Sequence, residues 1–199
     1  VKEYCAQAAA HAGVPQGRRT YIADFPKVWH EKCRMCFTEE NLRYTLDQLV
    51  AVLEYRKNAF KALGCPNIDA YNETTEQPLP RLIFACDEVA EMLDKTGADS
   101  ERKKLLSQIE SRLSTIARQG RAFGIHLILA TQRPDATIIP GQIKNNMDFR
   151  VCGRADSVLS QIILDNTSAA EQIPKDAQGR FITGDGTVFQ GYLFDEGQL

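Results

Sequence analysis

The chain has 199 residues, a length typical of one domain, and it can bury a hydrophobic core without disulfide or metal support. With 43% hydrophobic, 25% charged and 8% aromatic residues, its composition is that of a globular protein and excludes intrinsic disorder and a collagen-like fold. Lys and Arg number 24 against 26 Asp and Glu, so the formal net charge is −2. The chain is therefore not a polycation, and any contact with DNA has to be local.

Neither a membrane span nor a signal peptide is predicted, because no run approaches 18 apolar residues and the first residues carry no cleavage pattern. We expect a cytoplasmic location and no membrane contact by these residues. One of the six cysteines, Cys86, lies inside an apolar run, which favours reduced thiols in a cytosolic compartment. The only close pair is Cys33 and Cys36, with His30 just before it. A zinc site needs a fourth ligand and usually a second pair, so packing is the favoured interpretation.

The N-terminal part predicts helices that alternate with strands. Residues 1–12 are Ala-rich and indicate the end of a helix. The β-branched and aromatic run over residues 20–24 predicts a buried strand. A long helix follows over about residues 39–63, because Thr38 can cap it, its apolar residues recur every three or four positions, and Gly64 ends it.

The central part predicts two buried strands joined by a helix. Residues 81–88, RLIFACDE, form an apolar run that ends in two carboxylates, and residues 125–130 form a second apolar run. Because they are apolar on both faces, such strands belong inside a parallel sheet covered by helices. Between them, residues 100–119 have the spacing of an amphipathic helix. The three elements together predict a right-handed βαβ crossover.

The C-terminal part indicates a weaker repeat of this pattern and then a hairpin. A loop leads to a predicted strand near residues 149–152 and a helix near residues 157–164. The segments GRFIT and TVFQGYLF, separated by a Gly-Asp-Gly turn, predict a β-hairpin added antiparallel at the edge of the sheet. No internal repeat or domain boundary is evident, so we predict one domain over residues 1–199.

The first apolar strand ends in Asp87 and Glu88, which is the form of a Walker B motif. At the carboxyl edge of a sheet, Asp87 can hold Mg²⁺ through its water shell. Glu88 can orient and deprotonate a water that attacks the γ-phosphate of ATP. Apolar strands also end in acidic residues simply where a chain leaves a sheet, and this stays open as the alternative.

The second apolar strand ends in Thr131 and Gln132. Neighbouring parallel strands present their carboxyl ends to the same crevice, where α/β folds bind ligands. A hydroxyl and an amide there can hydrogen-bond the γ-phosphate or the attacking water. The alternative is a polar strand end that is satisfied by its own turn.

The chain resembles the FtsK/SpoIIIE family of hexameric DNA-pumping ATPases. The resemblance rests on LPRLIFACDEVAEML, on IPGQIKNN and above all on ARQGRAFGIHLILATQRP, with weaker similarity in YIADFPK, AVLEYRKNAFKALG, NIDAYN and IILDNTSAAEQI. It covers about residues 21–180. It implies a RecA-like P-loop NTPase fold, in which a mostly parallel sheet with helices on both faces forms a three-layer sandwich.

This resemblance implies roles for the residues at the two strand ends. Asp87 and Glu88 match the Walker B pair, and Gln132, together with Thr131, matches the sensor. ATP and Mg²⁺ are the implied cofactors, with Asp87 as the residue that holds the metal ion through water.

Arg121 matches the family's arginine finger, whose guanidinium is offered to the ATP of the adjoining subunit and stabilises charge on the transferring phosphoryl group. Arg118 is the reserve candidate. Without the resemblance, both arginines are better explained as a solvated helix end that interacts with the helix dipole.

Arg133 and Lys144 match basic positions of the family's DNA-contacting pore loops. The implied contact is with backbone phosphates, which is indifferent to base sequence and sensitive to salt. Pumps for duplex DNA often carry further basic residues after the strand near Arg150, where this chain has only Arg154. The resemblance therefore identifies the type of motor better than the polymer that the motor moves.

No G-x-x-x-x-G-K-[ST] sequence occurs in the 199 residues. Residues 13–20, GVPQGRRT, lack the lysine and precede a strand, which is the wrong geometry for a phosphate cradle. In the family the P-loop comes one helix earlier, so we expect the chain to be truncated just after the P-loop lysine. These residues alone should then show no ATP turnover.

The resemblance implies an ATP-dependent DNA translocase that works as a hexameric ring, in chromosome partition or conjugation. The complete bacterial protein would be tethered to the membrane, with this domain in the cytoplasm. A type VII secretion ATPase that moves proteins is one alternative. The ending GRFITGDGTVFQGYLF is more similar to such ATPases and to conjugative coupling proteins than to a chromosome segregation pump. A non-catalytic scaffold is the other; the missing P-loop favours it, whereas the retained site residues disfavour it.

Overall fold

The computed structural model describes residues 34–132 and 139–192. The chain divides into two compact units, Val1–Thr131 and Gln132–Leu199, which we call unit 1 and unit 2. The helix and strand expected over residues 1–12 and 20–24 lie outside the described residues. The prediction of one domain over the whole chain stays a prediction.

A pair of parallel strands forms the sheet of unit 1. The strands β1 (Leu82–Cys86) and β2 (Ile125–Leu129) pair in register, with Cys86 opposite Leu129. The pairing continues beyond the strands, because the Ala130 N–H donates to the Cys86 carbonyl oxygen at 2.8 Å. The two apolar runs are thus the neighbouring parallel strands that the sequence predicts, and their carboxyl ends lie side by side.

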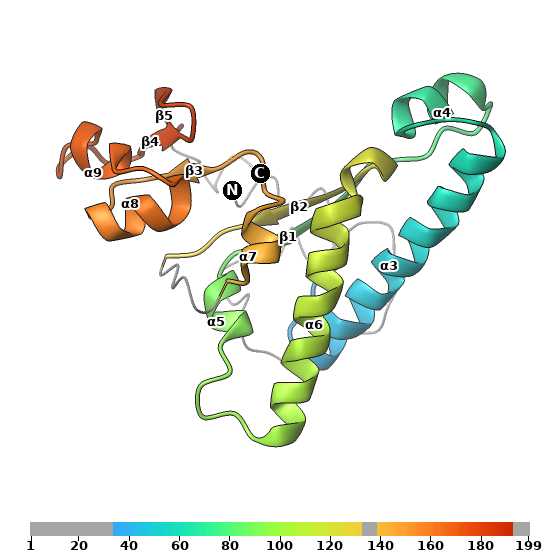
Figure 1. Ribbon diagram of the computed structural model, residues 1–199, viewed down its shortest axis with the longest axis horizontal. Coiled ribbons are helices and arrows are strands. Elements are labelled where there is room, and N and C mark those ends of the chain that lie inside the picture. Colours follow the sequence, from blue (N-terminus) through green and yellow to red (C-terminus); the bar gives the residue numbers. More distant parts are fainter. Residues whose placement is uncertain (1–33, 133–138, 193–199) are drawn as a thin grey trace, which may run out of the picture. The chain divides into compact units, whose positions relative to one another are not determined.

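Two long helices supply most of the core of unit 1. The helices α3 (Glu39–Ala62) and α6 (Ser100–Gln119) pack against each other, and α6 also packs against β2 (Figure 1). Thr38 caps α3 as predicted, because its hydroxyl oxygen accepts a hydrogen bond from the Asn41 N–H at 3.2 Å. Each buried aliphatic side chain contributes about 1.5–3 kcal/mol. The fully buried ones on these helices are Leu46, Leu53, Leu106, Ile109, Leu113 and Ile116.

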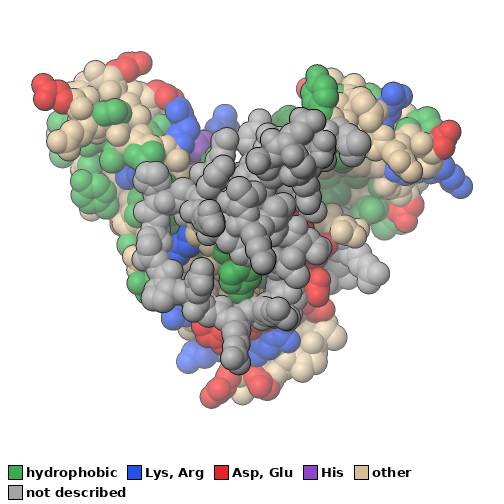
Figure 2. Space-filling view, turned by 180° about the vertical axis from the view of Figure 1, so that it is seen from behind, with side chains coloured by type: hydrophobic (Ala, Val, Ile, Leu, Met, Phe, Trp, Pro, Cys, Tyr) green, Lys and Arg blue, Asp and Glu red, His purple; other side chains and the backbone are tan. Residues whose placement is uncertain are grey.

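Ion pairs occupy the solvent-facing sides of the same helices. Arg102 of α6 pairs with Glu39 of α3 at 2.8 Å, and Lys95 pairs with Glu110 at 2.6 Å. Figure 2 shows acidic and basic side chains together at the lower end of the view, over the start of α6. These pairs are partly exposed, so each contributes about 1 kcal/mol or less.

Two short helices of unit 1 are not predicted from the sequence. Helix α4 (Ile68–Thr74) follows α3, and helix α5 (Val89–Leu93) begins directly after Glu88. Neither is long enough to show a clear helical period. Among residues 34–132 and 139–192, none of the helices has the length and apolar character that a membrane span requires.

Arg56 of α3 is buried and hydrogen-bonds the backbone just before each of the two strands. With only 3% of its surface exposed, it donates to the carbonyl oxygens of Pro80 and Phe123 at 2.7 Å each and of Gly124 at 3.4 Å. Pro80 precedes β1, whereas Phe123 and Gly124 precede β2. Burial lowers the pKa of the Arg56 guanidinium. The three carbonyl oxygens replace the water that the group loses.

Arg56→Met should destabilise the chain strongly, because it removes the donor that Arg56 supplies to the Pro80 and Phe123 carbonyl oxygens. We expect the free energy of unfolding to fall by about 3 kcal/mol. The matched control is Lys57→Met, which removes a cation paired with the exposed Glu54 and should cost less than about 1 kcal/mol. Urea denaturation followed by circular dichroism compares the two. Equal losses in both variants would contradict the role of Arg56.

Unit 2 is built on a three-stranded antiparallel sheet. Its strands lie in the order β3 (Val151–Cys152), β4 (Arg180–Thr183) and β5 (Val188–Gln190). Helix α8 (Ser157–Leu164) packs against β3, and helix α9 (Ser168–Gln172) packs against β4. The predictions of α8 and of the β4–β5 hairpin are confirmed, whereas α9 is too short to predict. The buried core is formed by Cys152, Ala155, Leu164, Ala169, Ile173 and Ile182.

One expectation for this region is confirmed in part and another is wrong. The hairpin strands are antiparallel as expected, and β4 also pairs antiparallel with β3, while the place of the hairpin at the edge of the larger sheet stays a prediction. The expected loop around Gly141 contains the short helix α7 (Gly141–Lys144). The mixed α/β class is confirmed, with a small parallel sheet and separate antiparallel strands. The three-layer sandwich with a mostly parallel sheet stays a prediction.

Candidate nucleotide site

The carboxyl ends of β1 and β2 bring Glu88 and Thr131 into contact. The Thr131 hydroxyl donates a hydrogen bond to the Glu88 carboxylate oxygen Oε1. The backbone supports this contact, because the Val89 N–H donates to the Ala130 carbonyl oxygen at 2.9 Å, just beyond the paired strands. A hydroxyl from one strand end therefore fixes the carboxylate of the other.

The two acidic residues lie in different environments. Asp87 is exposed at the bend that follows β1, whereas Glu88 is half-buried. Glu88 is the N-cap residue of α5, but its side chain does not cap that helix. An exposed carboxylate suits a hydrated cation, and a half-buried carboxylate held by a hydroxyl suits a base that positions one water molecule.

Gln132 and Arg133 follow Thr131 directly in the chain. Gln132 is exposed. Arg133 lies outside the described residues. Their roles as sensor and as DNA contact stay predictions.

Arg121 lies at the opposite end of β2 from Thr131. It is exposed and begins the 3₁₀ helix η1 (Arg121–Phe123), directly before the strand. The strand between them has five residues and spans about 16 Å, so Arg121 and Thr131 lie at opposite ends of that length. Arg118, the reserve candidate, is exposed in the last turn of α6. The role of Arg121 as the arginine finger, with Arg118 in reserve, stays a prediction.

Two glycines fix the turn that carries Arg121. A Cβ atom on Gly120 would lie 2.6 Å from the Ile125 carbonyl oxygen. Gly124 has a φ of 70°, and a Cβ atom there would lie 2.3 Å from the Ile68 side chain. The backbone of this turn therefore requires glycine at both ends of the GRAFG sequence.

His126 of β2 interacts electrostatically with Arg121. The sequence analysis did not identify His126 as a candidate site residue. Burial, and then the charges of Arg81 and Arg121, lower the pKa of His126. Its Nε2 atom is buried without a hydrogen-bond partner among the described residues. The imidazole is therefore neutral at pH 7 and adds no positive charge beside Arg121.

Lys144, the predicted DNA contact, is the last residue of α7 and forms an ion pair with Asp165 at 2.6 Å. Arg150 pairs with the same carboxylate. Hydrogen bonds from Lys144 and then from Arg150 lower the pKa of Asp165. No motif in the sequence indicated this cluster, because its members lie 15 and 21 residues apart.

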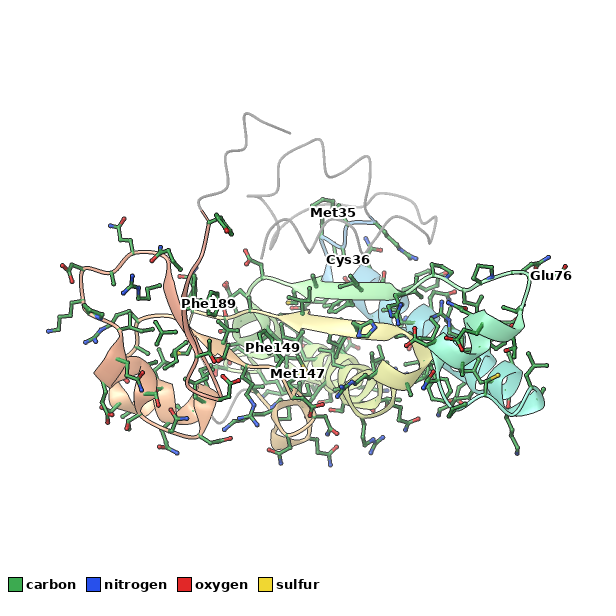
Figure 3. All side chains as sticks on the ribbon, turned by 90° about the horizontal axis from the view of Figure 1, so that it is seen from above. Met35, Cys36, Glu76, Met147, Phe149 and Phe189 are labelled. Carbon is green, nitrogen blue, oxygen red and sulfur yellow. The ribbon has the colours of Figure 1, made fainter. Side chains whose placement is uncertain are left out.

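Cys36 is held by packing and hydrogen bonding. Its Sγ atom lies 3.1 Å from the Thr45 Oγ1 atom, and burial raises the pKa of the thiol (Figure 3). Cys33 and His30 lie outside the described residues. Within residues 34–132 and 139–192, no group of three or more His, Cys, Asp and Glu side chains is placed to hold a metal ion.

Comparison with known proteins identifies the family. The profile of the FtsK/SpoIIIE family matches residues 22–136, which is more than half of the chain. The chain belongs to the FtsK/SpoIIIE family. Curated relatives include the DNA translocases FtsK of Halalkalibacterium halodurans, 34% identical over 139 residues, and of Staphylococcus aureus, 32% identical over 138 residues. Each match covers 64% of this chain but only 16% of the relative.

Solved structures show the same fold. The pCW3 conjugation coupling protein TcpA, in a monomer form with ATPγS, is similar with a TM-score of 0.84 and 36% identity, over 89% of this chain and 51% of that one. EssC ATPases 2 and 3 from Geobacillus thermodenitrificans share the fold, with a TM-score of 0.58 and 21% identity, over 75% of this chain and 26% of that one. The chain thus has the fold of FtsK/SpoIIIE-type ATPases.

Proposed function

We propose that this chain forms the hydrolysis and DNA-contacting part of an ATP-driven DNA translocase, which acts in chromosome partition or conjugative transfer. The observation that carries the proposal is the Glu88–Thr131 contact at the ends of adjacent parallel strands, in a member of an ATPase family. The proposal includes the RecA-like three-layer sandwich and a place on the cytoplasmic side of a membrane-tethered protein.

The residues at the strand ends carry the chemistry in this proposal. Glu88 orients the attacking water and takes its proton, while the Thr131 hydroxyl holds the Glu88 carboxylate in place. Gln132 hydrogen-bonds the γ-phosphate or the same water. Arg121 is offered to the ATP of the adjoining subunit, so the motor works as a ring, which we take to be hexameric.

The residues at the end of β1 fit a Mg²⁺ ion. Magnesium is usually held by one or two carboxylates together with waters and substrate phosphates, and Asp87 offers an exposed carboxylate at a strand end. The ion would be held through water by Asp87, and when bound it offsets negative charge on the phosphates.

The phosphates themselves need a further segment. Because the 199 residues contain no Walker A sequence, the β- and γ-phosphates are held in this proposal by a Walker A segment outside them. The active motor, which we call the assembled motor, therefore joins that segment to the present chain.

Single-molecule tracking on duplex DNA tests the proposed function. We expect the assembled motor to move along DNA when ATP is present and to stop with ATPγS. Contacts of Lys144 and Arg133 with phosphates predict movement that is independent of base sequence and weakened by salt. ATP hydrolysis without DNA binding or movement would contradict the proposal and favour a motor for protein cargo. A ring that never hydrolyses ATP would favour a scaffold.

A further inference from the structure

Two cations of unit 2 meet on one exposed carboxylate. The Lys144 Nζ atom donates to the Asp165 Oδ1 atom at 2.6 Å, and the Arg150 Nη1 atom donates to the Oδ2 atom at 2.5 Å. The Asp165 side chain is 58% exposed, whereas those of Lys144 and Arg150 are 27% and 25% exposed. One anion with two acceptor oxygens thus lies at the surface between an ammonium and a guanidinium group.

Arg150 is fixed independently of that carboxylate. Its Nε atom donates to the Met147 carbonyl oxygen at 3.1 Å, and its Nη1 atom donates to the Ile163 carbonyl oxygen at 3.1 Å. Figure 3 labels Met147, which lies in the segment between α7 and β3. Carbonyl oxygens do not cancel the charge, so the guanidinium keeps its place and its charge when Asp165 is replaced.

A phosphodiester matches Asp165 in the features that matter for this cluster. Each group carries one negative charge on two oxygens that accept hydrogen bonds, and both pair well with Lys and Arg. We propose that Lys144 and Arg150 form a binding site for a nucleic-acid backbone phosphate, and that Asp165 occupies this site until a phosphate displaces it. The inference rests on the proposed function, and it adds Arg150 as a DNA contact and Asp165 as an internal competitor.

The exchange of anions is energetically easy. Exposed ion pairs contribute little to stability and are screened by salt, so the chain loses little when a phosphate takes the place of Asp165. Removal of the Asp165 charge should therefore strengthen DNA binding without harming the fold.

Asp165 is also well suited to a clean substitution. It ends α8 with a φ of 60°, a left-handed conformation that Asn adopts readily. Asp165→Asn thus removes the charge and keeps the backbone, and Asp165→Gly is a second neutral variant for the same conformation. The matched control is Asp176→Asn, which removes one negative charge at an exposed turn elsewhere in unit 2.

Fluorescence anisotropy with a labelled duplex of about 20 base pairs tests the site on the 199-residue chain. We expect D165N to bind about five-fold more tightly than the wild type, and D176N less than two-fold. The plot of log affinity against log salt should steepen by about 0.9 for D165N, because in the wild type the displaced Asp165 carboxylate takes up a counterion and lowers the net ion release by about one. Lys144→Gln combined with D165N should lose the gain.

The outcomes distinguish failure of the phosphate site from failure of the proposed function. Equal gains in D165N and D176N would overturn the site, because overall charge would then explain both. If no variant binds DNA, the DNA-contact part of the proposed function fails, and NMR titration with pyrophosphate decides on the site. Shifts of the Lys144 and Arg150 side-chain signals that are larger in D165N or D165G than in the wild type support an anion site, and the lack of any such difference overturns it.

Discussion

The Glu88→Gln variant of the assembled motor should bind ATP normally but fail to hydrolyse it. The amide has nearly the shape of the carboxylate, and its oxygen can still accept the hydrogen bond from Thr131. It cannot take the proton of the attacking water, so kcat should fall by about 10²–10⁴-fold. Isothermal titration with Mg-ATP and a phosphate-release assay measure the two quantities separately.

Two further variants sharpen this prediction. Thr131→Val removes the hydroxyl but leaves the carboxylate, so it should lower kcat by about ten-fold through poorer positioning of Glu88. Glu91→Gln changes an exposed acid on α5 and should leave turnover unchanged. Normal turnover in E88Q would remove Glu88 from its role, and loss of ATP binding in E88Q would show that its role is structural.

Arg121→Ala should lower hydrolysis by about 10²–10³-fold while ATP binding by the same subunit is retained. The reason is geometric, because β2 lies between Arg121 and the strand end where Glu88 and Thr131 meet. In the proposed ring, its guanidinium is offered to a neighbour's nucleotide. Arg118→Ala tests the reserve candidate. The matched control is Lys104→Ala, which removes an exposed cation from α6 that has no proposed role in hydrolysis.

Mixed rings test whether Arg121 acts on the neighbouring subunit. R121A subunits keep Glu88, and E88Q subunits keep Arg121, so each variant alone should be inactive. A random equal mixture places the two intact groups at about a quarter of the interfaces of a ring, where activity should return. Complete absence of recovered activity in the mixture would contradict an action of Arg121 in trans.

The sequence predicted the elements that have a strong repeating pattern. The amphipathic spacing of α3 and α6 continues over several turns, and both helices begin within a residue of a capping side chain. The apolar runs of β1 and β2 predicted buried neighbouring strands. The strands are neighbours, but β1 is half-buried along its length and only Ile125 of β2 is buried. Their parallel pairing then explains why Glu88 and Thr131 meet, since parallel neighbours end at the same edge.

Short elements and pairing partners could not be predicted in the same way. Helices α5 and α9 have five residues each, which is too few for a period to show. Strand β3 has two residues, and its sequence does not say that it pairs antiparallel with β4. Strand partners are chosen by contacts between distant segments, which local propensity does not encode.

By itself, the sequence determined the family, the main helices and strands, and which residue types end the two central strands. Only the tertiary structure decided that Arg56 bonds to carbonyl oxygens up to 68 residues away, and that Lys144 and Arg150 share Asp165. The physical reason is that periodicity and capping act within one or two turns of chain. Buried hydrogen bonds and ion pairs instead depend on which segments the core brings together.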